Sequence, residues 1–252
     1  MAASPQGSVP RYVGAAFAAQ FSTSFAAGIL SLSILSGDVG DVLRAADTDA
    51  TRLRLAVLLE LLTSIGIIAL TSLLYVAFRD TVRWVATVAC AFWLAEATVL
   101  AVSTLGLYTL LDVSGKSSGS GAAVASSDAA VGQFALGLHE HAGDIAMLFF
   151  SAGALLWYAL FIRTRFVPQW LAVWGLASVV PVVLGTLLTV WGLQPSMLLY
   201  AAYVPYELVV GIWLLVKGSP GWPQTFDPTN SVLGPEGEGS DATTRARSEL
   251  PG

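Results

Sequence analysis

The sequence has a single cysteine, two histidines and few charged residues, and each shortage excludes a class of protein. Cys90 stands alone, so the chain forms no internal disulfide and no cysteine-based metal site. His139 and His141 lie in one segment, which excludes a haem held by histidines from two helices. Charged residues make up 12% of the chain, against roughly 25% in soluble domains, and no basic patch for nucleic acid is present.

What the sequence has instead is apolar residues in long runs. Hydrophobic residues make up 55% of its 252 positions. The mean hydropathy is +0.71, which indicates that lipid is the solvent. We therefore expect the lipid bilayer to be the main partner, and we expect neither a nucleic-acid partner nor a cofactor.

Six of the apolar runs are long enough to cross a bilayer, which takes roughly 20 helical residues each. The sequence therefore predicts an all-α, polytopic integral membrane bundle over residues 1–217. The predicted spans are 12–35, 53–78, 82–111, 133–162, 167–191 and 196–216.

The basic residues of the short loops predict the orientation of these spans. With six spans, most of them fall on one side of the membrane, which the positive-inside rule makes cytoplasmic. These residues are Arg11, Arg79, Arg83, Arg163, Arg165 and Lys217. Both termini are then cytoplasmic, and the chain is expected to be a multi-pass protein of the bacterial inner (plasma) membrane.

Three polar segments are predicted to lie outside the membrane. Residues 112–131 contain GKSSGSGAAVASSDAA, which predicts a flexible outer tether. Residues 218–252 are rich in Pro, Gly, Ser and acidic residues and predict a disordered cytoplasmic tail. The acidic segment 38–49 lacks the spacing and glycine of an EF-hand, so a solvated loop is expected there.

Carboxylates at bilayer depth are the strongest sign of a functional site. Each costs about 2.5 to 3.5 kcal/mol at a helix centre on insertion scales, so such groups face the interior of a bundle. They occur in four different spans, at central to outer depths, which favours one polar cavity that opens outward. The alternative is that each glutamate is protonated or hydrogen-bonded to a neighbouring helix and only fixes the packing of the helices. The candidate ligand-binding residues are Glu60, Glu96, Glu140, His141, Asp144, Tyr203 and Glu207.

Helical spacing indicates which faces line this cavity. In the fourth span one polar stripe recurs at steps of three, four or seven residues, and in the first span a small, polar seam does the same. The stripe consists of Gln133, Gly137, Glu140, Asp144, Ser151 and Tyr158, and the seam of Gln20, Ser24, Gly28 and Ser31.

The HEH segment suggests a metal site, but its spacing opposes the simplest version. His139 and His141 lie about 200° apart around a helix, so they cannot both bind one metal ion. His139 is expected to face away from the cavity. His141 and Asp144 remain as weak metal candidates, completed by a glutamate of another helix. Histidines that hydrogen-bond at the outer interface are the preferred interpretation.

Several segments resemble a known bacterial family of six-span membrane proteins, the domain of unknown function DUF4386. The matching segments are RYVG at 11–14, LLELLTSIGII at 58–68, the glutamate of FWLAE at Glu96, LLWYALFIRTRFVPQWLAVWGL at 155–176 and ELVVGIWLLVKG at 207–218. Trp93 stands where an arginine often precedes the third-span glutamate in that family. The resemblance implies a six-helix fold and no established activity.

The sequence leaves three functions open. The first is an outward-facing cavity that binds, senses or passes a small cation, a proton or a polar ligand. The second is a scaffold without enzymatic activity that stabilises or regulates a partner complex. The third is an intramembrane metal-dependent hydrolase, which needs His141, Asp144 and a glutamate to converge around an open metal position. The sequence favours the first, a function that is not enzymatic.

Overall fold

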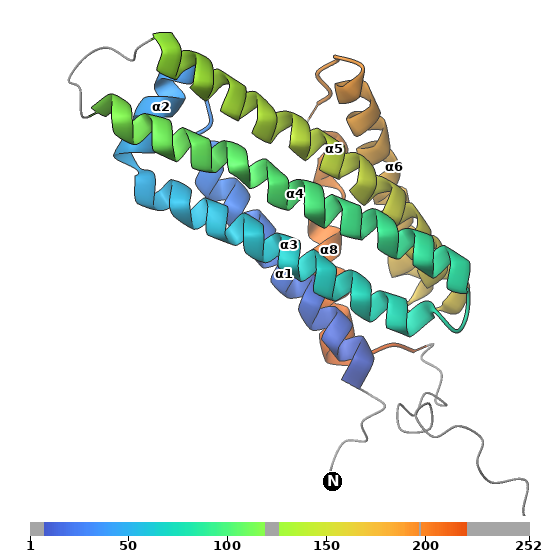
Figure 1. Ribbon diagram of the computed structural model, residues 1–252. Helices are drawn as coiled ribbons and strands as arrows, with labels where there is room; N and C mark the ends of the chain where they lie inside the picture. The colour runs from blue at the N-terminus through green and yellow to red at the C-terminus, as the bar shows by residue number, and fades with distance from the viewer. Residues whose placement is uncertain (1–7, 119–125, 197, 221–252) are drawn as a thin grey trace, which may run out of the picture.

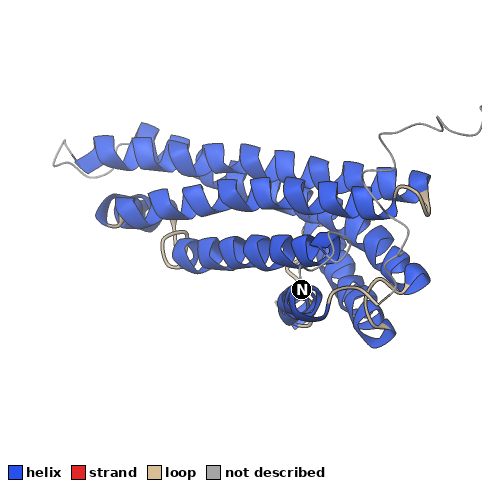
Figure 2. Cartoon of the chain, turned by 90° about the horizontal axis from the view of Figure 1, so that it is seen from below, coloured by secondary structure: helices blue, strands red, loops and turns tan. Residues whose placement is uncertain are grey.

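The computed structural model describes residues 8–118, 126–196 and 198–220, and within these ranges it contains helices and loops but no strand (Figures 1 and 2). The all-α prediction is confirmed. The helices are α1 (Ser8–Leu32), α2 (Val39–Thr48), α3 (Ala50–Phe78), α4 (Arg83–Ser118), α5 (Ser126–Thr164), α6 (Gln169–Val190), α7 (Leu198–Ala201) and α8 (Val204–Lys217).

The prediction of six membrane spans is also confirmed. Six stretches are long and apolar enough to cross a membrane, and they lie in α1, α3, α4, α5, α6 and the segment Leu198–Lys217. Large apolar side chains cover the outside of the bundle, as Phe134 (72% exposed) and Ile65 (62% exposed) illustrate. So much apolar surface marks contact with lipid. The chain is a multi-pass membrane protein.

Two helices extend beyond their predicted ends. At roughly 1.5 Å per residue, the 36 residues of α4 and the 39 residues of α5 measure about 54 Å and about 58 Å, well beyond the roughly 30 Å of hydrocarbon. Most of the predicted tether at 112–131 is therefore helical, and residues 119–125 lie outside the described part. The predicted disordered tail also lies outside it from residue 221 onward.

The acidic segment between the first two spans is a helix, so the prediction of a loop there was wrong. The side chain of Asp38 accepts a hydrogen bond from the backbone N–H of Asp41 at 2.9 Å and so caps α2. Val42 and Leu43 are buried in an apolar cluster with residues of α3, α4 and α5, among them Leu107. This packing turns an otherwise polar segment into a helix. We refer to this end of the bundle as the α2 end.

The last span is interrupted rather than continuous. The short helix α7 stops at Ala201, and α8 begins at Val204 with Pro205 in its first turn. Proline suits the first turn because the N–H that it lacks would have no partner there. The break places Tyr203 at the cap of α8.

Most of the long helices pack against their neighbours in the chain, and the last helix, α8, packs against the first, α1. α4 lies between α3 and α5, α1 packs on α3 and α8, and α6 packs on α5 near its Thr164 end and diverges from it toward the α2 end (Figure 1). α1 and α8 approach closely because each has a glycine at the contact. A Cβ on Gly14 would lie 2.7 Å from the carbonyl oxygen of Gly211.

The arginine distribution predicts that the α2 end faces away from the cytoplasm. We expect a cysteine introduced at Asp47, in α2, to react in intact cells with a thiol reagent that cannot cross membranes. A cysteine at Asp80, in the exposed turn between α3 and α4, should react only after the membrane is opened. Both variants carry Cys90→Ser as background. The reverse labelling pattern would show the opposite orientation.

Trp93 of α4 fills the space above Gly153 of α5, so this glycine is expected to be essential for packing. A Cβ at position 153 would overlap the indole ring. Gly153→Ala should therefore lower the free energy of unfolding by about 1 to 3 kcal/mol. Gly137→Ala, on the same helix with no atom within 4 Å of the added Cβ, is the matched control. Thermal unfolding in detergent measures both, and equal melting temperatures would contradict this packing.

Candidate functional site

A cavity of about 650 Å³ lies between the helices in the half of the bundle nearer the α2 end. α1, α3, α4 and α5 form most of its wall, and Thr186 of α6 and Tyr200 of α7 complete it. Several of its lining residues, such as Ser24 and Leu32, are also exposed, so the cavity opens to the surface of the bundle. The polar seam predicted on the first span, from Gln20 to Ser31, lines it throughout.

A layer of aromatic rings lies at one end of the cavity, where Phe150 is a lining residue. The ring of Trp93 on α4 lies 6.4 Å from that of Phe17 on α1 and 6.2 Å from that of Phe150 on α5. The indole N–H of Trp93 donates a hydrogen bond to the backbone carbonyl of Phe150 at 3.1 Å, which fixes the level of α4 against α5. We call these three residues the aromatic floor.

Two polar side chains directly above the aromatic floor are buried, and each has one oxygen without a hydrogen-bond partner. Glu96 is 9% exposed and Gln20 is 8% exposed, and both line the cavity. Glu96 Oε2 and Gln20 Oε1 have no partner among the described residues. A buried acceptor without a donor costs about 1 to 3 kcal/mol, and more if it is charged. Both residues line the cavity, so a ligand bound there would lie next to them.

The mouth of the cavity is acidic. Glu140 and Asp144 lie one helical turn apart on α5, and both line the cavity. Glu140 is exposed and Asp144 is half-buried. The lining residues include three carboxylates and neither lysine nor arginine. The cavity thus combines negative charge with apolar walls.

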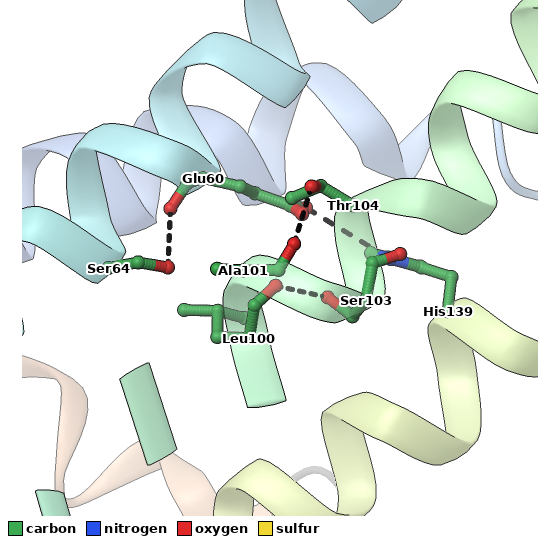
Figure 3. Close-up of polar contacts among 7 residues, drawn as sticks. All are labelled: Glu60, Ser64, Leu100, Ala101, Ser103, Thr104 and His139. Atoms are coloured by element: carbon green, nitrogen blue, oxygen red, sulfur yellow. Dashed lines mark hydrogen bonds and ion pairs between the residues drawn. The ribbon is translucent and has the colours of Figure 1, made fainter. Parts of the chain in front are cut away.

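His139 lies between three helices, contrary to the prediction that it faces away. Its Nδ1 lies 3.4 Å from the backbone carbonyl of Ser103 on α4, and its Nε2 lies 3.9 Å from Glu60 Oε1 on α3 (Figure 3). The residue is half-buried and lines the cavity. Glu60, by contrast, does not line the cavity. Its carboxylate points toward the imidazole instead.

Below the aromatic floor, a chain of hydrogen bonds holds the last carboxylate. The hydroxyl of Tyr203 donates to Glu207 Oε1 at 2.7 Å, and the hydroxyl of Tyr158 donates to that of Tyr203 at 2.8 Å. All three side chains are buried. Tyr203 also packs against Phe150, with ring centres 5.0 Å apart, so this chain supports the floor from beneath.

Comparison with known proteins identifies the family and nothing more specific. The model of a family described as a domain of unknown function, DUF4386, matches residues 12–218, from the first turns of α1 to the end of α8. The chain belongs to the DUF4386 family. No curated protein and no solved structure matches it. The match confirms the resemblance seen in the sequence and leaves the function of this DUF4386 protein to be argued from its cavity.

The structure of this DUF4386 protein divides the seven predicted site residues into separate groups. Glu96, Glu140 and Asp144 line the cavity. Glu60 pairs with His139 beside it, while Tyr203 and Glu207 bond to each other below it. His141 is exposed and does not line the cavity. The carboxylates come from four helices, but only two of these, α4 and α5, direct carboxylates into the cavity.

The separation of His141 from Asp144 removes the basis for the predicted metal site. Asp144 faces the cavity, and His141 lies on the exposed side of α5. Among the described residues, no group of three or more His, Cys, Asp or Glu side chains could hold a metal ion. The arrangement needed for an intramembrane metal-dependent hydrolase is therefore not formed by these residues.

Sequence reasoning missed His139 and the aromatic floor. Both histidines of HEH have neighbouring carboxylates, so periodicity alone could not decide which one faces inward. Gly106 of α4 decides it, because a Cβ there would lie 3.1 Å from His139 Cβ, and only glycine allows α5 to approach so closely. The HEH segment and the glycine in STLG together are the signal that could have identified His139.

The hydrogen-bond chain predicts a graded effect of removing tyrosine hydroxyls. Tyr203→Phe breaks both bonds and leaves the Glu207 carboxyl without its donor, which should cost about 1 to 3 kcal/mol of unfolding free energy. Tyr158→Phe removes one bond and keeps the Tyr203–Glu207 bond, so its cost should be smaller. Thermal unfolding in detergent ranks the two variants. A larger loss for Tyr158→Phe would contradict the arrangement.

Proposed function

We propose that this DUF4386 protein binds a small organic cation in the cavity, from the outer face of the bacterial plasma membrane. One observation carries the proposal. The cavity contains three carboxylates, and one of them, Glu96, is buried at the aromatic floor with an oxygen that has no partner. A buried carboxylate without a partner is costly, and a positively charged ligand removes that cost.

The size and walls of the cavity support an organic ligand over a bare ion. Its volume of about 650 Å³ lies within the range of roughly 300 to 1,000 Å³ found for small-molecule sites. Apolar side chains such as Ile67, Leu100 and Met147 line it next to the carboxylates. A cation with a hydrocarbon part would contact both kinds of surface.

The orientation and the aromatic floor support entry from outside. The α2 end is predicted to face away from the cytoplasm, and the cavity lies in that half of the bundle. Below the cavity, buried aromatic side chains, among them Trp93 and Phe161, fill the bundle toward the opposite end. The scaffold hypothesis relied on the polar loop and the tail, which lie mostly outside the described residues, so the described part of the chain adds no support to it.

The protein should bind amines in preference to neutral molecules of the same shape. We expect primary amines to raise its melting temperature in detergent, and alcohols with the same carbon chains to leave it unchanged. Glu96→Gln and Asp144→Asn should each weaken amine binding by about tenfold to about a hundredfold, because each removes a charge-assisted hydrogen bond.

Asp47→Asn is the matched control, because Asp47 is exposed on α2 and outside the cavity. It should bind amines as the wild type does. Equal effects of amines and alcohols, or unchanged amine binding in both cavity variants, would refute the proposed function.

A further inference from the structure

The carboxylates of the cavity lie at different depths, and the aromatic floor provides the reference level. Phe17, Trp93 and Phe150 are in contact, so α1, α4 and α5 share one level there. Gln20 on α1 lies three residues from Phe17 toward the α2 end, and Glu96 on α4 lies three residues from Trp93 in the same direction. At roughly 1.5 Å per residue, both lie about 4.5 Å above the floor.

α5 carries the two higher carboxylates. Met147 lies three residues from Phe150 toward the α2 end and is therefore level with Glu96. Asp144 lies three residues beyond Met147, which is about 4.5 Å at the helical rise. Glu140 lies four residues further, about 6 Å closer to the mouth. A second contact confirms this register, because Gly106 of α4 faces His139 of α5. The carboxylates thus form a series of three steps from a buried floor to an exposed mouth.

The opposite wall is neutral and can accept hydrogen bonds. Gln20, Ser24 and Ser31 of α1 follow the same direction, and Gln20 Oε1 is buried without a partner at the lowest step. Apolar side chains of Ile67, Leu100 and Met147 line the space beside them. Met147 lies level with Glu96, and Leu100, four residues beyond Glu96 on α4, lies about 6 Å closer to the mouth, so apolar surface extends along the series of carboxylates.

We infer that the ligand of this cavity is a linear polyamine, with one ammonium group at Glu96 and the next ones at Asp144 and Glu140. This inference rests on the proposed binding of an organic cation and specifies its class. A linear polyamine has ammonium groups separated by short methylene chains, which matches carboxylates spread along an apolar surface. A single ammonium group would neutralise one carboxylate and leave the other two negative charges of the cavity without a bound cation.

A divalent metal ion does not fit the same series. Such an ion needs several oxygen ligands around one point. The three carboxylates are spread over about 10 Å of helix length, as the helical rise gives it. Within the described ranges, no cluster of three metal-ligating side chains exists.

The test compares ligands that share a four-carbon chain but differ in charge. Binding of butylamine, putrescine and the triamine spermidine to the full chain in nanodiscs is measured by calorimetry at constant ionic strength. Each added ammonium group should tighten binding by about tenfold or more. In Glu140→Gln, the advantage of spermidine over putrescine should fall at least severalfold, and in Asp144→Asn the advantage of putrescine over butylamine should fall likewise.

These ratios separate a role in recognition from a role in folding. Glu140 is exposed, so Glu140→Gln leaves the buried packing intact, and Asp47→Asn should keep all the ratios of the wild type. Equal affinities for the three amines would overturn the polyamine inference while the proposed cation binding stands. Displacement of putrescine by magnesium or calcium at equal concentration would also overturn it. No binding of any amine would refute both proposals.

Discussion

The contact of Trp93 with Phe17 and Phe150 is the constraint on which the rest of the structure depends. It joins three helices at mid-depth, and the indole hydrogen bond to the Phe150 carbonyl fixes their register in a medium where a lost hydrogen bond has no water to replace it. Gly153 makes room for the indole. Above this layer the helices separate around the cavity, and below it aromatic side chains fill the bundle. The position of Glu96, one turn above the layer, follows directly.

The buried carboxylates of this DUF4386 protein differ in their surroundings. Glu207 has its partner in Tyr203, and Glu60 has His139 within 3.9 Å. Glu96 and Gln20 line the base of the cavity, and each has a buried oxygen without a partner, as Glu60 Oε2 also has beside the cavity. A buried polar atom without a partner lowers the stability of the fold. The presence of Glu96 and Gln20 at the base of an acidic cavity is what a binding site for a cation requires.

The sequence predicts the parts of this structure that depend on composition and period. Long apolar runs give the six spans, and the spacing of Gln20 and Ser31 identifies the lining face of α1. It does not predict α2, because the acidic segment becomes helical only through burial of Val42 and Leu43 against other helices. It also does not show which carboxylates share the cavity. That depends on partners from distant segments, such as His139 for Glu60, and on the glycine contact at Gly106 that sets the rotation of α5.

The central claim is that a cation occupies the space between α1 and α5 above the aromatic floor. Photo-crosslinking tests this directly, with an alkyl diamine that carries a diazirine between its ammonium groups, followed by peptide mapping by mass spectrometry. The account predicts crosslinks to cavity residues such as Gly28 and Met147, which an excess of putrescine suppresses. Crosslinks confined to exposed apolar residues such as Phe134, or labelling that putrescine does not reduce, would contradict it.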